Sequence, residues 1–376
     1  MAKKKAEHFG FFSSWITVLI PVIFLTGLGL LTLISAASYA ENTLMFFDKQ
    51  AKWLVLAVLM SIGAAFINLE ILKKCFWVFL LLSIPLLIVV LIPQLVEPIN
   101  GARRWIKIGS YTIQPSEFSK IALVITMAFY LQKNQRYIKT FWRGLIFPLC
   151  IFGMFSALII LEPDYGTSVL CAIVGLSLLF LAGTKFIYLV GTCILGFLGL
   201  AVMIFLNPVR WARLISFTDV EANKLEGTYQ LNQALTGFGA GGISGAGLGQ
   251  GSQQQYFLPE AHTDFIFAIV GEELGLLMTL SVVFAFFFLF VYVCTKLKYA
   301  QNLFELYLAI GAMLMIVMQS IFNMGVVTGL FPTKGISLPF VSYGGSNLVV
   351  MFVFVGLILN CLRSWRNPQQ IKAKEL

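Results

Sequence analysis

Long apolar runs, separated by short polar segments, dominate the hydrophobic pattern of this 376-residue chain. A helix needs roughly 20 apolar residues to cross about 30 Å of hydrocarbon. The runs that approach or exceed this length fall at residues 12–37, 51–68, 75–93, 116–131, 143–161, 167–184, 186–206, 265–295, 303–327 and 345–363. The pattern therefore predicts an all-α polytopic membrane protein with ten transmembrane helices.

Composition supports this fold class and excludes others. The chain is 59% hydrophobic and only 11% charged, whereas soluble domains carry about 25% charged residues. A soluble globular enzyme, a disordered chain and a nucleic-acid-binding domain are therefore excluded, despite the net charge of +9. The six cysteines lie in or beside the apolar runs without CxxC spacing, and there are only two histidines. Neither a disulfide framework nor a His-based zinc site is expected.

The basic residues predict the orientation. An even number of spans places both termini on one side, and sixteen of the 26 Lys and Arg residues fall on that side. Short cytoplasmic loops accumulate Lys and Arg, so both termini are expected in the cytoplasm. The first apolar run is too long for the core of a signal peptide and is interpreted as an uncleaved first helix. We expect one integral membrane domain, 1–376, with cytoplasmic tails 1–11 and 364–376 and a large extracytoplasmic loop, 207–263, between the seventh and eighth helices.

Most of the unusual polar residues fall on the predicted outer side, in loops 94–115, 207–263 and 328–344. Long loops without secondary structure are usually functional unless they are disordered. An enzyme or receptor that acts outside the cytoplasm would have this pattern.

Two short motifs place charge at span boundaries, where charge is costly and often functional. In 114–120, Pro115 and Ser116 suit a helix start, and Glu117 and Lys120 can pair at i and i+3. A capped helix with an ion pair and a contact with substrate are both open interpretations, and they are compatible. In 162–167, Asp164 could cap the next helix or pair with Lys120 or an arginine, and the structural role is favoured.

The region from 237 to 273 carries three further candidates. The stretch 237–251 has eight glycines and could be a hinge or expose N–H groups to a phosphate; composition favours the hinge. Asp264 could be a general base at the membrane boundary, or Thr263 and Asp264 could cap the following helix, which the residues alone favour. Glu272 and Glu273 lie deeper in the same span, and at least one is expected to pair with a cation or to be protonated.

Taken together, five motifs in order resemble those of the SEDS family, the FtsW/RodA-type glycan polymerases of bacteria. They are NGARRWI, QPSEFSK, EPDYGT, GAGLGQGSQQQYFLPEAHTDFIFAIVGEELG and FPTKGISLPFVSYGGSN. The resemblance runs from the first span to the last. Within the family, PTKG, PEAHTDFIF and Arg103 before Arg104-Trp105 are choices typical of the division members, whereas Gln254 and Val220 depart from their pattern.

The resemblance implies a peptidoglycan glycosyltransferase that polymerises lipid II into β-1,4 glycan with inversion at the anomeric carbon. It makes Asp264 the catalytic general base, reversing the preference for a cap. The positions expected to contact substrate are Arg103, Arg104, Lys107, Glu117, Lys120, Asp164, His262, Lys334 and Ser342. Arg210 and Arg213 are further outer-side cations that could face the pyrophosphate.

The resemblance also implies partners and a location. No cofactor is evident, and a divalent cation, Mg²⁺ or Mn²⁺, could assist at the pyrophosphate. A class B penicillin-binding protein, which is a transpeptidase, and other membrane proteins of the division complex are the expected partners, and no nucleic acid is. The expected location is the bacterial cytoplasmic membrane, with enrichment at the septum. A lipid II flippase and a non-catalytic scaffold that recruits a transpeptidase are the alternatives.

Overall fold

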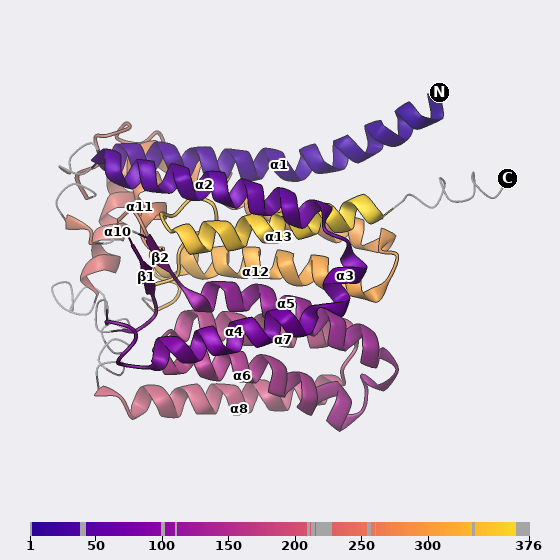
Figure 1. The fold of residues 1–376 in the computed structure, drawn as a ribbon. Helices are drawn as coiled ribbons and strands as arrows, with labels where there is room; N and C mark the ends of the chain where they lie inside the picture. Colours follow the sequence, from indigo (N-terminus) through magenta and orange to yellow (C-terminus); the bar gives the residue numbers. More distant parts are fainter. Residues whose placement is uncertain are drawn as a thin grey trace.

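The computed structural model shows a bundle of long helices (Figure 1). It describes residues 2–37, 43–98, 102–109, 111–208, 211, 215, 228–253, 257–259, 261–332 and 335–365. In chain order the main helices are α1 (Ala2–Ala37), α2 (Thr43–Phe66), α3 (Leu69–Lys74), α4 (Phe76–Leu91), α5 (Pro115–Asn134), α6 (Phe147–Leu161), α7 (Tyr165–Ala182), α8 (Phe186–Phe205), α10 (Tyr229–Gly241), α11 (Ile266–Lys296), α12 (Leu303–Val327) and α13 (Gly345–Ser364). A π-helical turn, Trp142–Ile146, leads directly into α6.

Each of the ten apolar runs coincides with a helix. Eight helical segments of the described residues are long and apolar enough to cross a membrane. α4 is shorter, at 16 residues, and α5 carries Glu117 and Lys120 near its start. The start of α1 and the end of α13 lie at the same end of the bundle, which we call the terminal end (Figure 1). The predicted helical membrane protein is therefore confirmed.

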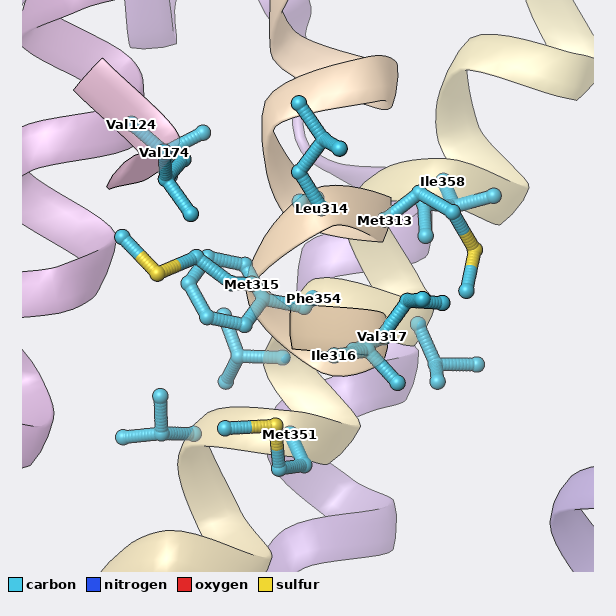
Figure 2. Close-up of a cluster of buried hydrophobic side chains, with 14 of the residues drawn as sticks. Val124, Val174, Met313, Leu314, Met315, Ile316, Val317, Met351, Phe354 and Ile358 are labelled. Atoms are coloured by element: carbon cyan, nitrogen blue, oxygen red, sulfur yellow. The ribbon is translucent and has the colours of Figure 1, made fainter. Parts of the chain in front are cut away.

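α12 and α13 form the centre of the bundle. The apolar window of α13 is 94% buried, whereas that of α8, at the edge, is 6% buried. Figure 2 shows Met313, Leu314 and Met315 of α12 surrounded by Val124, Val174, Met351, Phe354 and Ile358 from α5, α7 and α13. Lipid tails are as apolar as these side chains, so close packing is the force that holds such helices together. At Gly356 a Cβ atom would come within 2.2 Å of the Ser61 carbonyl on α2, so glycine permits the close approach of α13 and α2.

Two elements at the opposite end, the loop end, depart from the expectation of helices and structureless loops. A two-stranded antiparallel hairpin, β1 (Ile106–Ile108) and β2 (Tyr111–Ile113), lies within the predicted loop 94–115. The sequence IKIGSYTI alternates β-formers around a glycine, and Gly109 adopts φ +60° at the connection, as a tight hairpin turn requires. The predicted loop 207–263 contains α10. The all-α prediction was therefore wrong for the hairpin, whereas the extracytoplasmic loop 207–263, which includes α10, stays a prediction.

Candidate active site at the loop end of the bundle

Asp264 lies on the segment Ala261–Phe265, just before α11, and is half-buried. α11 begins at Ile266 with Phe265 in the N-cap position, and no side-chain hydrogen bond is made from that position. The helix-cap interpretation of Thr263 and Asp264 therefore places the cap at the wrong residue. The carboxylate lies against the loop 335–344. A Cβ atom placed on Gly335 would be only 2.7 Å from Asp264 Oδ2.

The loop 335–344 is hydrogen-bonded to the segment that carries Asp264. Ser342 Oγ donates to the Thr263 carbonyl at 2.6 Å and accepts from the Leu338 amide at 2.7 Å. The Tyr343 amide donates to the His262 carbonyl at 2.9 Å. Ser342 was predicted to contact substrate; the structure places it where it fixes the backbone next to the acid.

Two amide side chains of α12 add to this connection from inside the bundle. Asn323 Nδ2 donates to the Asp264 and Ile336 carbonyls, both at 2.7 Å. Gln319 lies one turn earlier, and its Nε2 donates to the Ser337 carbonyl at 2.9 Å. One face of α12 thus holds two backbone segments, the segment that carries Asp264 and the loop 335–344 that faces it.

The predicted pair of Glu117 and Lys120 is formed and is almost completely buried. Lys120 Nζ lies 2.7 Å from Glu117 Oε1 and 2.7 Å from Gln319 Oε1, and the two charged side chains are 1% and 6% exposed. Pro115 occupies the first turn of α5, as expected. Because removing one partner would leave the other charge buried and uncompensated, this pair is a strong structural constraint. It connects through Gln319 to the loop beside Asp264.

Asp164 confirms the favoured structural role. It is the N-cap of α7, and its Oδ1 accepts a hydrogen bond from the Thr167 amide at 3.1 Å. The Arg104 side chain donates to two backbone carbonyls of the same turn. Its Nε lies 3.1 Å from the Glu162 carbonyl and its Nη2 2.6 Å from the Pro163 carbonyl. The alternative pairing with Lys120 is not formed, since Lys120 contacts Glu117.

Glu162, next to this cap, was not predicted as a site residue. It is fully buried, and neither carboxylate oxygen has a hydrogen-bond partner among the described residues. Burial, together with the charge of Asp164, raises the pKa of Glu162 to about 8, and the nearby Arg104 charge opposes this shift. The side chain is therefore largely protonated near neutral pH.

The glycine-rich stretch encloses Glu272 and Glu273. Glu272 Oε1 accepts from the Ser252 and Gln253 amides at 2.8 and 3.1 Å. Glu273 Oε1 accepts from the Gly249 amide at 3.1 Å and from Ser35 Oγ at 2.7 Å. The predicted cation partner is not found for either carboxylate among the described residues. Backbone N–H groups bind one oxygen of each carboxylate, the Ser35 hydroxyl also binds Glu273, and Glu272 Oε2 is buried without a partner among the described residues.

The glycines serve close packing. α11 is interrupted at Gly275, where φ is +74°, and a Cβ atom there would lie 2.4 Å from the Gly245 nitrogen. Gly241 would likewise place a Cβ atom 2.0 Å from the Gly271 carbonyl oxygen. Residues 237–241 of the stretch form the end of α10, and the residues after them are hydrogen-bonded to the first half of α11. The hinge that composition favours stays a prediction.

The remaining predicted residues fall in three situations. His262 packs against the rings of Phe46 and Tyr343, with centroids 5.3 and 5.8 Å away. Lys107 lies on β1 in an exposed pair with Glu97, at 3.1 Å. Arg103, beside Arg104, is half-buried, and its Nε has no partner among the described residues. Lys334, Arg210 and Arg213 lie outside the residues that the structure describes.

Sequence reasoning missed the buried amides of α12 and α13, namely Gln319, Asn323 and Asn347. The side chain of Asn347 donates to Ser337 Oγ, on the loop beside Asp264. Two amides four residues apart in an apolar span share one helix face, and polar groups inside membranes usually pair or mark function. That spacing was the available signal.

Metal-ligating side chains do not gather in the described part of the chain: no group of three or more His, Cys, Asp or Glu residues could hold an ion there. Divalent cations such as Mg²⁺ prefer several carboxylate or carbonyl oxygens at short range. The divalent cation expected at the pyrophosphate stays a prediction.

A many-helix membrane bundle with a half-buried carboxylate at one end, held by polar side chains of its central helix, defines a polytopic membrane protein with a candidate active site at the membrane boundary. The family model described as "Cell cycle protein", for FtsW, RodA and SpoVE, matches residues 13–367. The chain belongs to this family.

Relatives and solved structures agree with this assignment. The chain is 35% identical to the probable peptidoglycan glycosyltransferase FtsW of Pseudomonas fluorescens, over 94% of this chain and 88% of that protein. It is 38% identical to the protein of the same name in Nitrosococcus halophilus, over 85% and 84%.

Among solved structures, a chain from a peptidoglycan synthase complex that coordinates polymerization and crosslinking superposes with a TM-score of 0.77 at 25% identity, covering 93% of this chain and 98% of that one. The rod shape determining protein RodA of Thermus thermophilus shares the fold, with a TM-score of 0.70 at 23% identity and coverage of 94% and 97%.

Proposed function

We propose that this chain is a peptidoglycan glycosyltransferase that polymerises lipid II into β-1,4 glycan strands during cell division. The observation that carries the proposal is Asp264, a half-buried carboxylate at the loop end whose flanking backbone is fixed by Ser342 and Asn323. Relatives about 35% identical over most of the chain are named as such transferases, and they supply the substrate class.

In the proposed reaction Asp264 is the general base. The 4-hydroxyl of one lipid II attacks the anomeric carbon of the growing chain from the face opposite the leaving group. The new C–O bond forms as the bond from that carbon to the undecaprenyl pyrophosphate breaks, so α becomes β. The hydroxyl proton passes to Asp264, and a positioned base of this kind typically contributes about 10²–10⁴-fold to the rate.

Positive charge near the departing pyrophosphate would stabilise it. Arg103, Arg104 and Lys107 belong to the hairpin and to the segment before it, at the same loop end as Asp264 (Figure 1), and Lys334 precedes Gly335 in the sequence. We assign these cations to the pyrophosphate. Glu117 and Lys120 are buried against Gln319 and act by supporting the loop beside the acid. A divalent cation remains a proposal without assigned ligands, and no step depends on it.

Ten spans, with both termini in the cytoplasm of a bacterium, are the proposed topology. The start of α1 and the end of α13 lie together at the terminal end of the bundle (Figure 1). Most Lys and Arg residues are predicted on that side, which favours the cytoplasm. The loop end, with Asp264, then faces lipid II outside the cytoplasm. We propose that a class B penicillin-binding protein and other division proteins bind there and on neighbouring helices, and that the complex is enriched at the septum.

Polymerisation of lipid II by the purified protein, in complex with a transpeptidase-inactive class B partner, tests the proposal. We expect long glycan on a gel from the wild type and none from Asp264→Asn, which keeps the shape of the side chain but not its basicity. Ser320→Ala is a control on α12, since the Ser320 hydroxyl donates to Val317 within that helix. Polymer from a folded Asp264→Asn variant would refute the assigned base, and absence of polymer from an intact wild-type complex would favour the flippase or scaffold.

A further inference from the structure

One side-chain nitrogen connects the backbone of Asp264 to the loop that faces its carboxylate. Asn323 Nδ2 donates one hydrogen bond to the Asp264 carbonyl and one to the Ile336 carbonyl, each at 2.7 Å. These carbonyls belong to segments 72 positions apart in the sequence, one before α11 and one before α13. Asn323 therefore joins the chain that carries the carboxylate to the loop that faces it.

An amide is well suited to this position. Its NH₂ group carries two hydrogens in one plane, so one neutral nitrogen can satisfy two carbonyls. Asn323 is 1% exposed, and without the amide two buried carbonyls would lose their partner, which is costly in a low-dielectric interior. Gln319 supports the Ser337 carbonyl in the same way, so two consecutive peptide carbonyls of the loop rest on one face of α12.

The facing loop also lies in contact with the carboxylate itself. A Cβ atom on Gly335 would be 2.7 Å from Asp264 Oδ2, which is closer than such a contact allows. Gly335 precedes Ile336, the residue that Asn323 holds. The position of the loop therefore sets how much room the carboxylate has.

We propose that Asn323 is a positioning residue for Asp264, because it holds the backbone that carries the carboxylate, and that Gly335 leaves the space that the carboxylate occupies. The inference rests on the proposed function, because it assigns Asn323 to the geometry of the proposed base. A base must lie within hydrogen-bond reach of the hydroxyl that it deprotonates, and a misplacement of about 1 Å can cost on the order of 10²-fold in rate. Asn323 and Gly335 thus act on turnover and need not touch substrate.

Steady-state polymerisation by the complex with its transpeptidase-inactive partner tests this inference. Asn323→Leu removes both donors at similar volume, and Gly335→Ala adds one methyl group against the carboxylate. We expect kcat to fall roughly 30- to 100-fold in both variants with KM within about threefold of wild type. Ser320→Ala, the control on α12, should stay within about twofold.

The pH profile of Gly335→Ala adds a readout that a structural role would not change. The methyl group would crowd Asp264 Oδ2 and restrict its hydration, which disfavours the charged form and should raise the pKa of Asp264. The acid limb of the kcat profile should therefore move to higher pH. A kcat within threefold of wild type in either folded variant, or a fall in kcat with an unmoved acid limb in Gly335→Ala, would overturn the inference.

Amide hydrogen exchange separates this inference from the proposed function, because it requires no activity. Peptides covering 261–266 and 335–342 should exchange faster in Asn323→Leu than in the wild type and remain unchanged in Ser320→Ala. If Asn323→Leu exchanged faster but the wild type made no polymer, the structural connection made by Asn323 would be supported and the proposed polymerase activity refuted. Unchanged exchange in those peptides would refute the connection, whether or not the wild type polymerises.

Discussion

Glu272 and Glu273 follow Asp264 by eight and nine residues in the sequence. The surroundings of these carboxylates nevertheless differ. Asp264 is half-buried at the loop end, and the protein fixes its backbone. Glu272 and Glu273 are each 1% exposed, and their carboxylates accept hydrogen bonds from the glycine-rich turn. The three carboxylates thus divide into one that is half-buried beside the loop 335–344 and two that are buried and hold the 249–253 turn against α11.

The comparison shows how function and stability can be separated at acidic residues in a membrane. One oxygen of Glu272 and one of Glu273 accept backbone N–H bonds, which hold the 249–253 turn against α11. At Asp264 the main-chain carbonyl is bonded to Asn323, and the carboxylate lies against Gly335. Substitutions should therefore affect stability at the first kind of site and turnover at the second.

The largest stability loss should come from Lys120→Met, which extends the comparison to a buried ion pair. It leaves Glu117 charged and without its partner inside the bundle, and breaking such pairs typically costs about 3–5 kcal/mol. Thermal unfolding in detergent micelles would measure the change. The double variant Lys120→Met/Glu117→Gln should recover much of the loss, and a single variant as stable as the wild type would contradict this account of the pair.

Glu272→Ala should follow, with a loss of about 2–3 kcal/mol, because the backbone amides of Ser252 and Gln253 lose their acceptor. Activity per folded molecule should change far less than in Asp264→Asn. The matched measurement is unfolding of both variants beside their polymerisation rates. If Glu272→Ala abolished turnover without destabilising the protein, the proposed division between the two kinds of carboxylate would be wrong.

Glu162→Gln sharpens the comparison through pH. The folded carboxyl has a pKa of about 8, and its ordinary value is 4.5, so between these values the folded state keeps a proton that the unfolded state releases. Wild-type stability should therefore decline as pH rises from about 5 to 8, whereas below about 4.5 the stabilising contribution of the protonated carboxyl is fully present and no longer varies with pH. The stability gap in favour of Glu162→Gln should widen over that interval. Glu97→Gln, at an exposed carboxylate, is the control and should show no such widening.

The smallest effect should be that of Lys107→Ala on stability. Lys107 and Glu97 are 55% and 81% exposed, and exposed pairs contribute less than about 1 kcal/mol. The unfolding temperature should stay close to that of the wild type. A clear fall in lipid II affinity with unchanged stability would support its assignment to the pyrophosphate, and a large loss of stability would show that the hairpin depends on this pair.

The helices could be predicted from the sequence because a helix that crosses the membrane needs a run of about 20 apolar residues. Such runs can be read directly along the chain. The i, i+3 pairing of Glu117 and Lys120 and the cap at Asp164 were also predictable, because both are local. The roles of Glu272, Asn323 and Gly335 were not. Their partners are the 249–253 turn, Asp264 and the loop before α13, and only the tertiary fold brings these segments together.

The edge helix α8 differs most from the central helices, since only 6% of its apolar window is buried. Its 20 residues span about 30 Å, close to the thickness of the hydrocarbon layer. With so little protein around it, the tilt of α8 follows hydrophobic mismatch with the surrounding lipid. Bilayer thickness therefore acts more directly on this helix than on α12 and α13, which other helices surround.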